Sequence, residues 1–343
     1  MSICLSHTSA DRALETLACG GQAVEMAASS AVYSFEATDS AVSAVSDELE
    51  YLLGPEARDL NLLVGTDGER HSTEKKVVHK WAGPLPEGSL AKVCDGLYIS
   101  TPSFCLLQQA AELHTINLCQ MLGRYLAVAT PKGGRDGKTL QKRAPLLDEA
   151  ALGQYLSQFS RPRGAARVRE AIRWTAARAA SPQETNLQLA FTLPYAYGGF
   201  GLAKPLMNHK VTLSEKAKAL CGKEECYIDL YWRGKNCGIE YQGSFHNRQI
   251  DEDYARFYAL DCMGKQVLFV ADAQLKDAVQ MNYIARKVAK RLGKKVSRDR
   301  WPSESDLQGL LDALNGSRVP NRSERRRTRR VSGQRERLGA ACS

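Results

Sequence analysis

The sequence predicts an α/β protein, and two observations support that prediction. The C-terminal half alternates helical patterns with short apolar strand patterns, in the order helix, strand, hairpin, helix, strand, helix. The N-terminal half shows strand patterns at 60–64 and 76–81 and a hairpin pattern at 92–100. We therefore expect a mixed sheet flanked by helices in the C-terminal part, preceded by a small α/β domain.

The N-terminal α/β domain is expected to span residues 36–130. Residues 1–35 before it are small and weakly patterned, and they predict no element. The turn Asp95-Gly96 is typical of a tight hairpin, and Thr101-Pro102 is typical of a helix start, with the threonine as N-cap. The expected elements, in order, are a helix over 37–53, strands over 60–64 and 76–81, the hairpin over 92–100 and the helix from 101.

Residues 131–180 are expected to form a linker followed by helices, and residues 181–292 a second domain. Ser181-Pro182-Gln183-Glu184 has the composition of a helix N-terminus with a capping box. Residues 293–343 are expected to be a basic, mostly disordered tail. The predicted helices are 147–159, 165–179, one from Ser181, 250–263, 275–292 and a short one over 303–314; the predicted strands are 206–213, 226–232, one from Cys237, and 266–271.

The composition argues against a membrane or secreted protein. The chain has 343 residues and 43% hydrophobic residues, enough for packed cores, but no apolar run approaches the roughly 18 residues of a membrane span. The N-terminus does not show a basic flank followed by an apolar core, so we expect a cytoplasmic protein without a membrane partner. Its ten cysteines contain no Cys-x-x-Cys pair, which predicts reduced structural thiols.

The positive charge is concentrated near the C-terminus. Of the net charge of +9, seven charges lie in residues 318–337, which hold nine arginines and two glutamates, and a second basic run covers 286–298. This pattern fits a partner with a phosphate backbone, and it equally fits a solvated helix face with a disordered solubilising tail. On the first interpretation the tail contacts nucleic acid through Arg325, Arg326, Arg327, Arg329 and Arg330.

Two strands carry carboxylates in apolar surroundings. Asp229 lies among apolar residues of the first strand, while Glu240 and Gln242 are two apart and so project from one face of the second. Burying such carboxylates alone is costly. Two of them facing each other favour a divalent cation held by oxygen ligands, and the alternative is ordinary salt bridging at a sheet edge.

As an ordered set, these motifs resemble the PD-(D/E)XK nuclease superfamily, and within it the very-short-patch-repair endonuclease-like group of bacterial proteins. The resemblance covers about residues 181–292 and implies a restriction-endonuclease-like fold. The matching stretches are Ser181-Pro182-Gln183-Glu184-Thr185, Leu193-Pro194, Gly198-Gly199-Phe200-Gly201-Leu202, Asp229-Leu230-Tyr231-Trp232, Glu240-Tyr241-Gln242-Gly243-Ser244-Phe245-His246, Asp253-Tyr254-Ala255-Arg256 and Gly264-Lys265-Gln266-Val267.

The resemblance implies that Asp229 and Glu240 bind Mg²⁺ or Mn²⁺, with the main-chain carbonyl of Tyr241 as a further ligand. Glu184 would orient a metal-bound water or complete the metal shell, and its alternative role is a helix cap. Gln242 departs from the usual lysine of the superfamily; it donates hydrogen bonds but carries no charge. His246 would act as general base or leaving-group acid, or else be structural.

Two further arginines are expected near the phosphates. Arg256 would contact a phosphate, although Asp253 one turn away makes a helix-surface ion pair the alternative. Arg248 would supply backbone contacts that are independent of base sequence.

The resemblance therefore implies a metal-dependent DNA endonuclease that hydrolyses phosphodiester bonds in phage defence or DNA repair. A homodimer would be needed to cut both strands at once. The stretch Tyr98-Ile-Ser-Thr-Pro-Ser-Phe-Cys-Leu-Leu-Gln108 faintly resembles the abortive-infection antitoxin family. The alternative is thus a non-catalytic, antitoxin-like transcriptional regulator on a nuclease scaffold, and a third interpretation is RNA binding through the basic tail.

Overall fold

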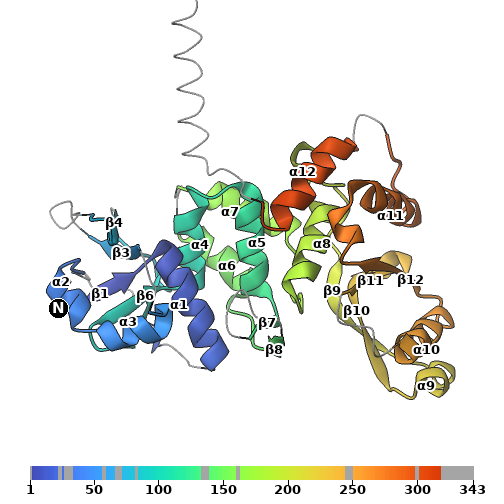
Figure 1. The fold of residues 1–343 in the computed structure, drawn as a ribbon, viewed down its shortest axis with the longest axis horizontal. Coiled ribbons are helices and arrows are strands. Elements are labelled where there is room, and N and C mark those ends of the chain that lie inside the picture. The colour runs from blue at the N-terminus through green and yellow to red at the C-terminus, as the bar shows by residue number, and fades with distance from the viewer. Residues whose placement is uncertain are drawn as a thin grey trace, which may run out of the picture.

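The computed structural model describes residues 2–21, 25–26, 34–55, 59–65, 72–81, 84–132, 139–159, 163–243, 250–297 and 301–317. This part of the chain contains twelve α-helices and three β-sheets, which confirms the α/β class (Figure 1). A six-stranded sheet lies in the N-terminal half and a four-stranded sheet in the C-terminal half, with a group of helices between them (Figure 1).

The N-terminal sheet has the strand order β2-β5-β6-β1-β3-β4, and both parallel and antiparallel pairs occur in it. The hairpin predicted around Asp95-Gly96 is confirmed, with Gly96 in the left-handed region at φ 83°. The six strands are β1 (Ile3–Leu5), β2 (Glu25–Met26), β3 (Leu60–Val64), β4 (Lys76–Lys80), β5 (Leu90–Cys94) and β6 (Leu97–Ser100).

Residues 1–35, whose sequence was uninformative, contain an interior strand and a long helix. Strand β1 lies in the interior of the sheet, between β6 and β3, and α1 (His7–Gly20) follows it directly. All three residues of β1 are fully buried, so the strand shows no alternation between apolar and polar residues. A three-residue strand is too short for the periodicity that sequence analysis depends on.

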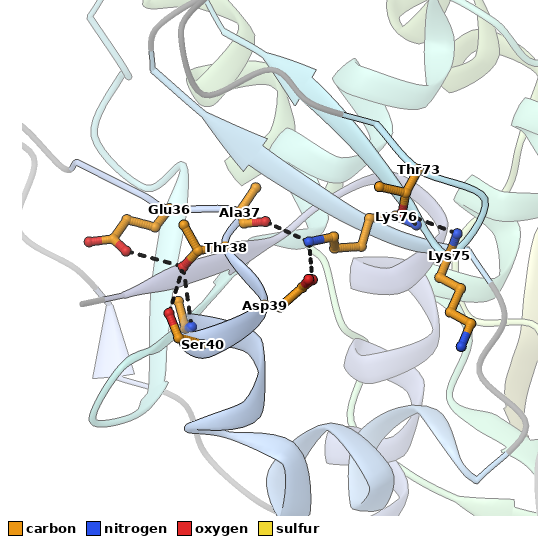
Figure 2. Close-up of polar contacts among 9 residues, drawn as sticks. Glu36, Ala37, Thr38, Asp39, Ser40, Thr73, Lys75 and Lys76 are labelled. Atoms are coloured by element: carbon orange, nitrogen blue, oxygen red, sulfur yellow. Dashed lines mark hydrogen bonds and ion pairs between the residues drawn. The ribbon is translucent and has the colours of Figure 1, made fainter.

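The helix predicted over 37–53 is divided into α2 (Asp39–Ser43) and α3 (Ser46–Leu53). Thr38, labelled in Figure 2, is the N-cap of α2, and its hydroxyl accepts a hydrogen bond from the Ala41 N–H. In the same view the Lys76 ammonium pairs with Asp39 and donates to the Ala37 carbonyl at 2.9 Å. These contacts hold the start of α2 against β4.

A group of helices joins the two halves. Gln120 donates from its side-chain amide to the Asn186 side chain and to the Leu314 carbonyl, both at 2.9 Å. A Cβ at Gly123 would lie 2.4 Å from Cγ2 of Thr185, so glycine allows the helix that carries Gly123 to approach the helix that carries Thr185 closely. The elements here are α4 (Pro102–Ala110), α5 (Thr115–Leu126), β7 (Ala129–Pro131), β8 (Leu140–Lys142), α6 (Glu149–Ser157), α7 (Ala165–Trp174) and α8 (Pro182–Thr192).

The helix predicted over 165–179 ends at Trp174. Side chains from α8 provide the reason, because Gln188 and Thr192 each donate to the Trp174 carbonyl at 2.6 Å. A helix end needs such partners for its last carbonyl groups, and these partners come from a distant segment that local sequence patterns do not reveal. One continuous apolar core therefore runs from the N-terminal sheet through these helices to α8.

The C-terminal sheet has the strand order β12-β11-β10-β9. Strands β9, β10 and β11 pair antiparallel, and β12 pairs parallel with β11. The predicted order of elements is confirmed, with one helix, α9, that was not predicted because it is only seven residues long. The elements are β9 (Leu206–Thr212), α9 (Glu215–Cys221), β10 (Glu225–Trp232), β11 (Cys237–Gln242), α10 (Ile250–Asp261), β12 (Gln266–Ala271) and α11 (Ala278–Arg291).

Helices cover both faces of this sheet. Ala259 and Leu260 of α10 pack with Ile228 and Tyr231 in one small core, while α8 and α11 contribute to the large core. The last described helix, α12 (Glu304–Leu314), packs against α5, α8 and α11 with its apolar residues Leu307, Leu310 and Leu311 buried. The boundary at 293 is therefore wrong, because 301–317 belong to the folded core; residues 318–343 lie outside the described ranges.

Candidate active site

Glu184 is fixed at the first turn of α8. Ser181 is the N-cap, and its hydroxyl accepts from the Glu184 N–H at 3.1 Å while donating to Oε1 at 3.0 Å. The Ala180 N–H donates to Oε2 at 2.8 Å. The carboxylate is only 7% exposed, and α8 lies against β10 and β11. The capping role is therefore confirmed, and the same bonds hold the carboxylate in one orientation next to the sheet.

Asp229 and Glu240 come from neighbouring antiparallel strands. Leu230 pairs with Ile239 in these two strands, and continuing this register by one step puts Asp229 opposite Glu240. Residues opposite each other in this way project from the same face. The Asp229 side chain accepts a hydrogen bond from the Tyr241 N–H at 2.7 Å, so it is tied to the backbone of β11.

Glu240 is buried, and only one of its two carboxylate oxygens accepts a hydrogen bond from the described residues. It is 4% exposed, and its Oε2 accepts from the Arg256 guanidinium at 2.8 Å. Its Oε1 has no hydrogen-bond partner among the described residues. Arg256 lies farther from Asp253, at 4.0 Å, so the arginine is primarily a partner of Glu240 rather than part of a helix-surface pair. An unpaired buried acceptor costs roughly 1–3 kcal/mol, and more when it is charged.

The electrostatics show that the three carboxylates act on one another. Burial, followed by the charge of Asp229, raises the pKa of Glu184 to about 8, against the opposing effect of the hydrogen bonds from Ala180 and Ser181. Burial also raises the pKa of Glu240 well above its usual range; the charges of Asp229 and Glu184 add to this and Arg256 opposes it. Buried carboxylates that perturb one another mark a candidate functional site.

Gln242 ends β11, two residues beyond Glu240, and is half-buried. Beside it, the Tyr241 hydroxyl donates to Asp272 at 2.8 Å, and Asp272 also pairs with Lys276. Burial, followed by this bond to Asp272, raises the pKa of the Tyr241 hydroxyl. Asp272 was not predicted; its position directly after a buried strand was the signal that could have identified it.

Several predicted site residues lie outside the described residues: His246, Arg248, Arg325, Arg326, Arg327, Arg329 and Arg330. Within the described ranges, no group of three or more His, Cys, Asp or Glu side chains forms a metal-binding cluster as it stands. All nine cysteines in the described part are free thiols. None of the described helices has both the length and the apolar character needed to cross a membrane.

Comparison of the chain with protein-family models, with curated proteins and with solved structures gives no match. The candidate site is therefore defined by its own geometry: three carboxylates from α8, β10 and β11, with the Arg256 guanidinium on one of them.

Proposed function

We propose that this protein is a metal-dependent endonuclease that hydrolyses phosphodiester bonds in DNA, with a restriction-endonuclease-like C-terminal half of the PD-(D/E)XK kind. One observation carries the proposal: Glu184, Asp229 and Glu240 come from three elements, and the charge of Asp229 raises the pKa of both buried glutamates. Such a charge cluster is stabilised by a cation. The order of elements around it, with two antiparallel strands followed by a parallel one, supports the same fold.

The residues present fit a hard divalent cation such as Mg²⁺ or Mn²⁺. All the candidate donors are oxygens, and Glu240 keeps one buried oxygen without a partner. Mg²⁺ needs only one or two protein carboxylates, because waters and substrate phosphates complete its shell. Asp229 and Glu240 would hold it, with Glu184 and the Tyr241 carbonyl nearby. When bound, the ion supplies an acidified water and neutralises charge on the phosphate.

The side chains around the carboxylates have separate tasks in this proposal. Glu184, held by Ser181 and Ala180, orients the attacking water from a fixed position. Gln242 donates a hydrogen bond to that water or to a phosphate oxygen, without contributing charge. Arg256 neutralises Glu240 before substrate binds and provides a guanidinium that pairs with a phosphate in two-point geometry.

A second function is favoured by two observations. Gln242 replaces the charged lysine of the superfamily, and Arg256 already occupies one oxygen of Glu240. Both fit a chain that keeps the nuclease scaffold without its chemistry. Such a chain would act as an antitoxin-like regulator that binds DNA, or as an RNA-binding protein through its basic tail.

Plasmid cleavage by the purified protein in Mg²⁺, Mn²⁺ or EDTA separates these functions. We expect metal-dependent cleavage that is lost in Asp229→Ala and Glu240→Ala and kept in Asp306→Ala, which removes an exposed carboxylate from α12. DNA binding that weakens with salt, with no cleavage in any metal, would refute the nuclease and favour the regulator. The same assay on an RNA of equal length identifies which nucleic acid is the substrate.

A further inference from the structure

Helix α11 carries positive charge on one exposed face and no acidic residue between Ala278 and Arg291. Residues spaced three and four apart share a face of a helix. On this helix the opposite face is buried, with Met281, Ile284 and Val288 in the core. We call the exposed set the α11 face; its residues are Val279, Tyr283, Arg286, Lys287 and Lys290.

Two of the three cations of the α11 face, Arg286 and Lys287, are positioned by aromatic rings rather than by acids. The Lys287 ammonium lies 4.5 Å from the centre of the Tyr283 ring. The Arg286 guanidinium lies 5.3 Å from the Trp301 ring, and its Nε donates to the Asn282 side chain at 3.0 Å. Contacts between a cation and an aromatic ring orient the side chain and leave its full charge in place.

Two lysines near the C-terminal sheet are neutralised by glutamates. Lys210 pairs with Glu225, and Lys218 pairs with two glutamates. No salt bridge to Arg286, Lys287 or Lys290 occurs within the described part of the chain. A solvated helix face normally mixes both signs of charge. The α11 face instead presents three unneutralised cations beside Tyr283, which is 62% exposed.

We propose that the α11 face binds the backbone of nucleic acid, with the Tyr283 ring as a stacking surface for an unpaired base. This inference rests on the proposed function, because it names the surface that holds the same substrate. Arg286 and Lys290 are four residues apart, about 6 Å along the helix axis. A nucleic-acid strand advances about 3.4 Å per phosphate, so this spacing matches about two steps of one strand. Exposed aromatic rings among cations are the usual surface for single strands.

The position of α11 also fits this role. Gln242, beside the carboxylates, pairs with Ala271, the last residue of β12. The chain then passes through Asp272, which bonds the Tyr241 hydroxyl, and α11 begins soon afterwards at Ala278. The helix starts at the end of the sheet that carries the candidate site, and its basic last turn lies near the other end, where Arg291 donates to the Gln266 carbonyl at 3.3 Å. A strand bound along α11 from Lys290 toward Ala278 would therefore run the length of the helix toward the carboxylates.

The test is the salt dependence of binding to a fluorescein-labelled 20-base-pair DNA duplex, measured by anisotropy on the full chain in EDTA. The variant R286Q/K287Q/K290Q is compared with K75Q/K142Q/K216Q, which removes three exposed lysines from other surfaces. Each lost phosphate contact lowers the slope of log K against log salt by about 0.9, so the α11 variant should lose up to about 2.7. The control should keep the slope of the unmodified protein.

Two further variants keep the test decisive. K287Q/K290Q leaves the Arg286 contact with Trp301 in place and should lose up to about 1.8 of the slope. Tyr283→Ala should weaken binding to a 20-nucleotide single strand by about 5- to 150-fold, the usual effect of losing one stacked base.

Equal slopes for the α11 variant and its control would overturn the proposal. So would loss of binding to phosphatidylserine vesicles with DNA binding unchanged, since that result assigns the face to a membrane surface. The binding test is made in EDTA, where no cleavage occurs, and its result does not depend on nuclease activity. A protein that binds DNA through the α11 face but does not cleave the plasmid in Mg²⁺ or Mn²⁺ would refute only the proposed nuclease.

Discussion

Replacing Glu184 by glutamine should stabilise the metal-free protein at alkaline pH. The folded protein holds the pKa of this carboxyl at about 8, against an ordinary value of 4.5. Between these two pH values the folded state binds a proton that the unfolded chain has released. Stability therefore falls as pH rises through this window, because the folded state binds more protons than the unfolded state.

The magnitude follows from the two pKa values. Integration from pH 5 to pH 8 gives a loss on the order of 3 kcal/mol of unfolding free energy in the unmodified protein. Glu184→Gln has no carboxyl to ionise and keeps the two local bonds, because its oxygen accepts from the Ala180 N–H and its amide donates to the Ser181 hydroxyl. The two proteins should be nearly equally stable at pH 5, and the variant should be more stable by about 3 kcal/mol at pH 8.

Urea denaturation in EDTA, followed by circular dichroism at several pH values, measures this difference. Asp306→Asn is the matched control: Asp306 has the same place in a Ser-capped helix start, but it is exposed. Its stability should stay parallel to that of the unmodified protein. Stability profiles for Glu184→Gln that also stay parallel would refute the coupling between the buried carboxylates, and with it the main support for a cation site.

Three other results are expected. Arg256→Gln should bind Mn²⁺ on the order of tenfold more tightly by calorimetry, because a charge-assisted hydrogen bond to Glu240 no longer competes; unchanged or weaker binding would contradict this. Burial, followed by the charge of His79, lowers the pKa of His7 to about 3, so the unfolding free energy should be complete above about pH 6.5 and fall by about 1 kcal/mol from pH 7.5 to pH 5.5. Asparagine tolerates the left-handed backbone at this position, where φ is 47°, so His7→Asn should still fold. Thermal melts of His7→Asn should lack the loss of stability between pH 7.5 and pH 5.5. Gly123→Ala should lower the melting temperature through its clash with α8, whereas Gly153→Ala, in open space on α6, should keep or raise it; equal shifts would argue against the close packing.

The strands that carry Asp229 and Glu240 could be predicted because the sequence within and around them shows every pattern expected of a hairpin. Alternating apolar residues, a turn between them and a following helix determined both elements and their shared face. Strand β1 could not be predicted, since three buried residues show no period. The end of α7 at Trp174 depends on side chains that reach it from α8.

The same limit applies to the candidate site. The sequence predicted that Arg256 contacts a phosphate or pairs with Asp253, whereas its ion pair with Glu240 depends on how α10 packs on the sheet. The position of Asp272 against Tyr241 likewise requires the parallel pairing of β12 with β11. Long-range packing, rather than local propensity, decided each of these contacts.

Because α5 and α8 approach closely at Gly123, the position of Glu184 depends on the N-terminal half. Thr185, which rests on Gly123, directly follows Glu184 in the chain. The N-terminal half therefore supports the first turn of α8 through this contact. A fragment that begins at residue 181 would keep Asp229 and Glu240, but Glu184 would lose the packing of the neighbouring Thr185 on Gly123. The C-terminal half alone should therefore not form the complete candidate site.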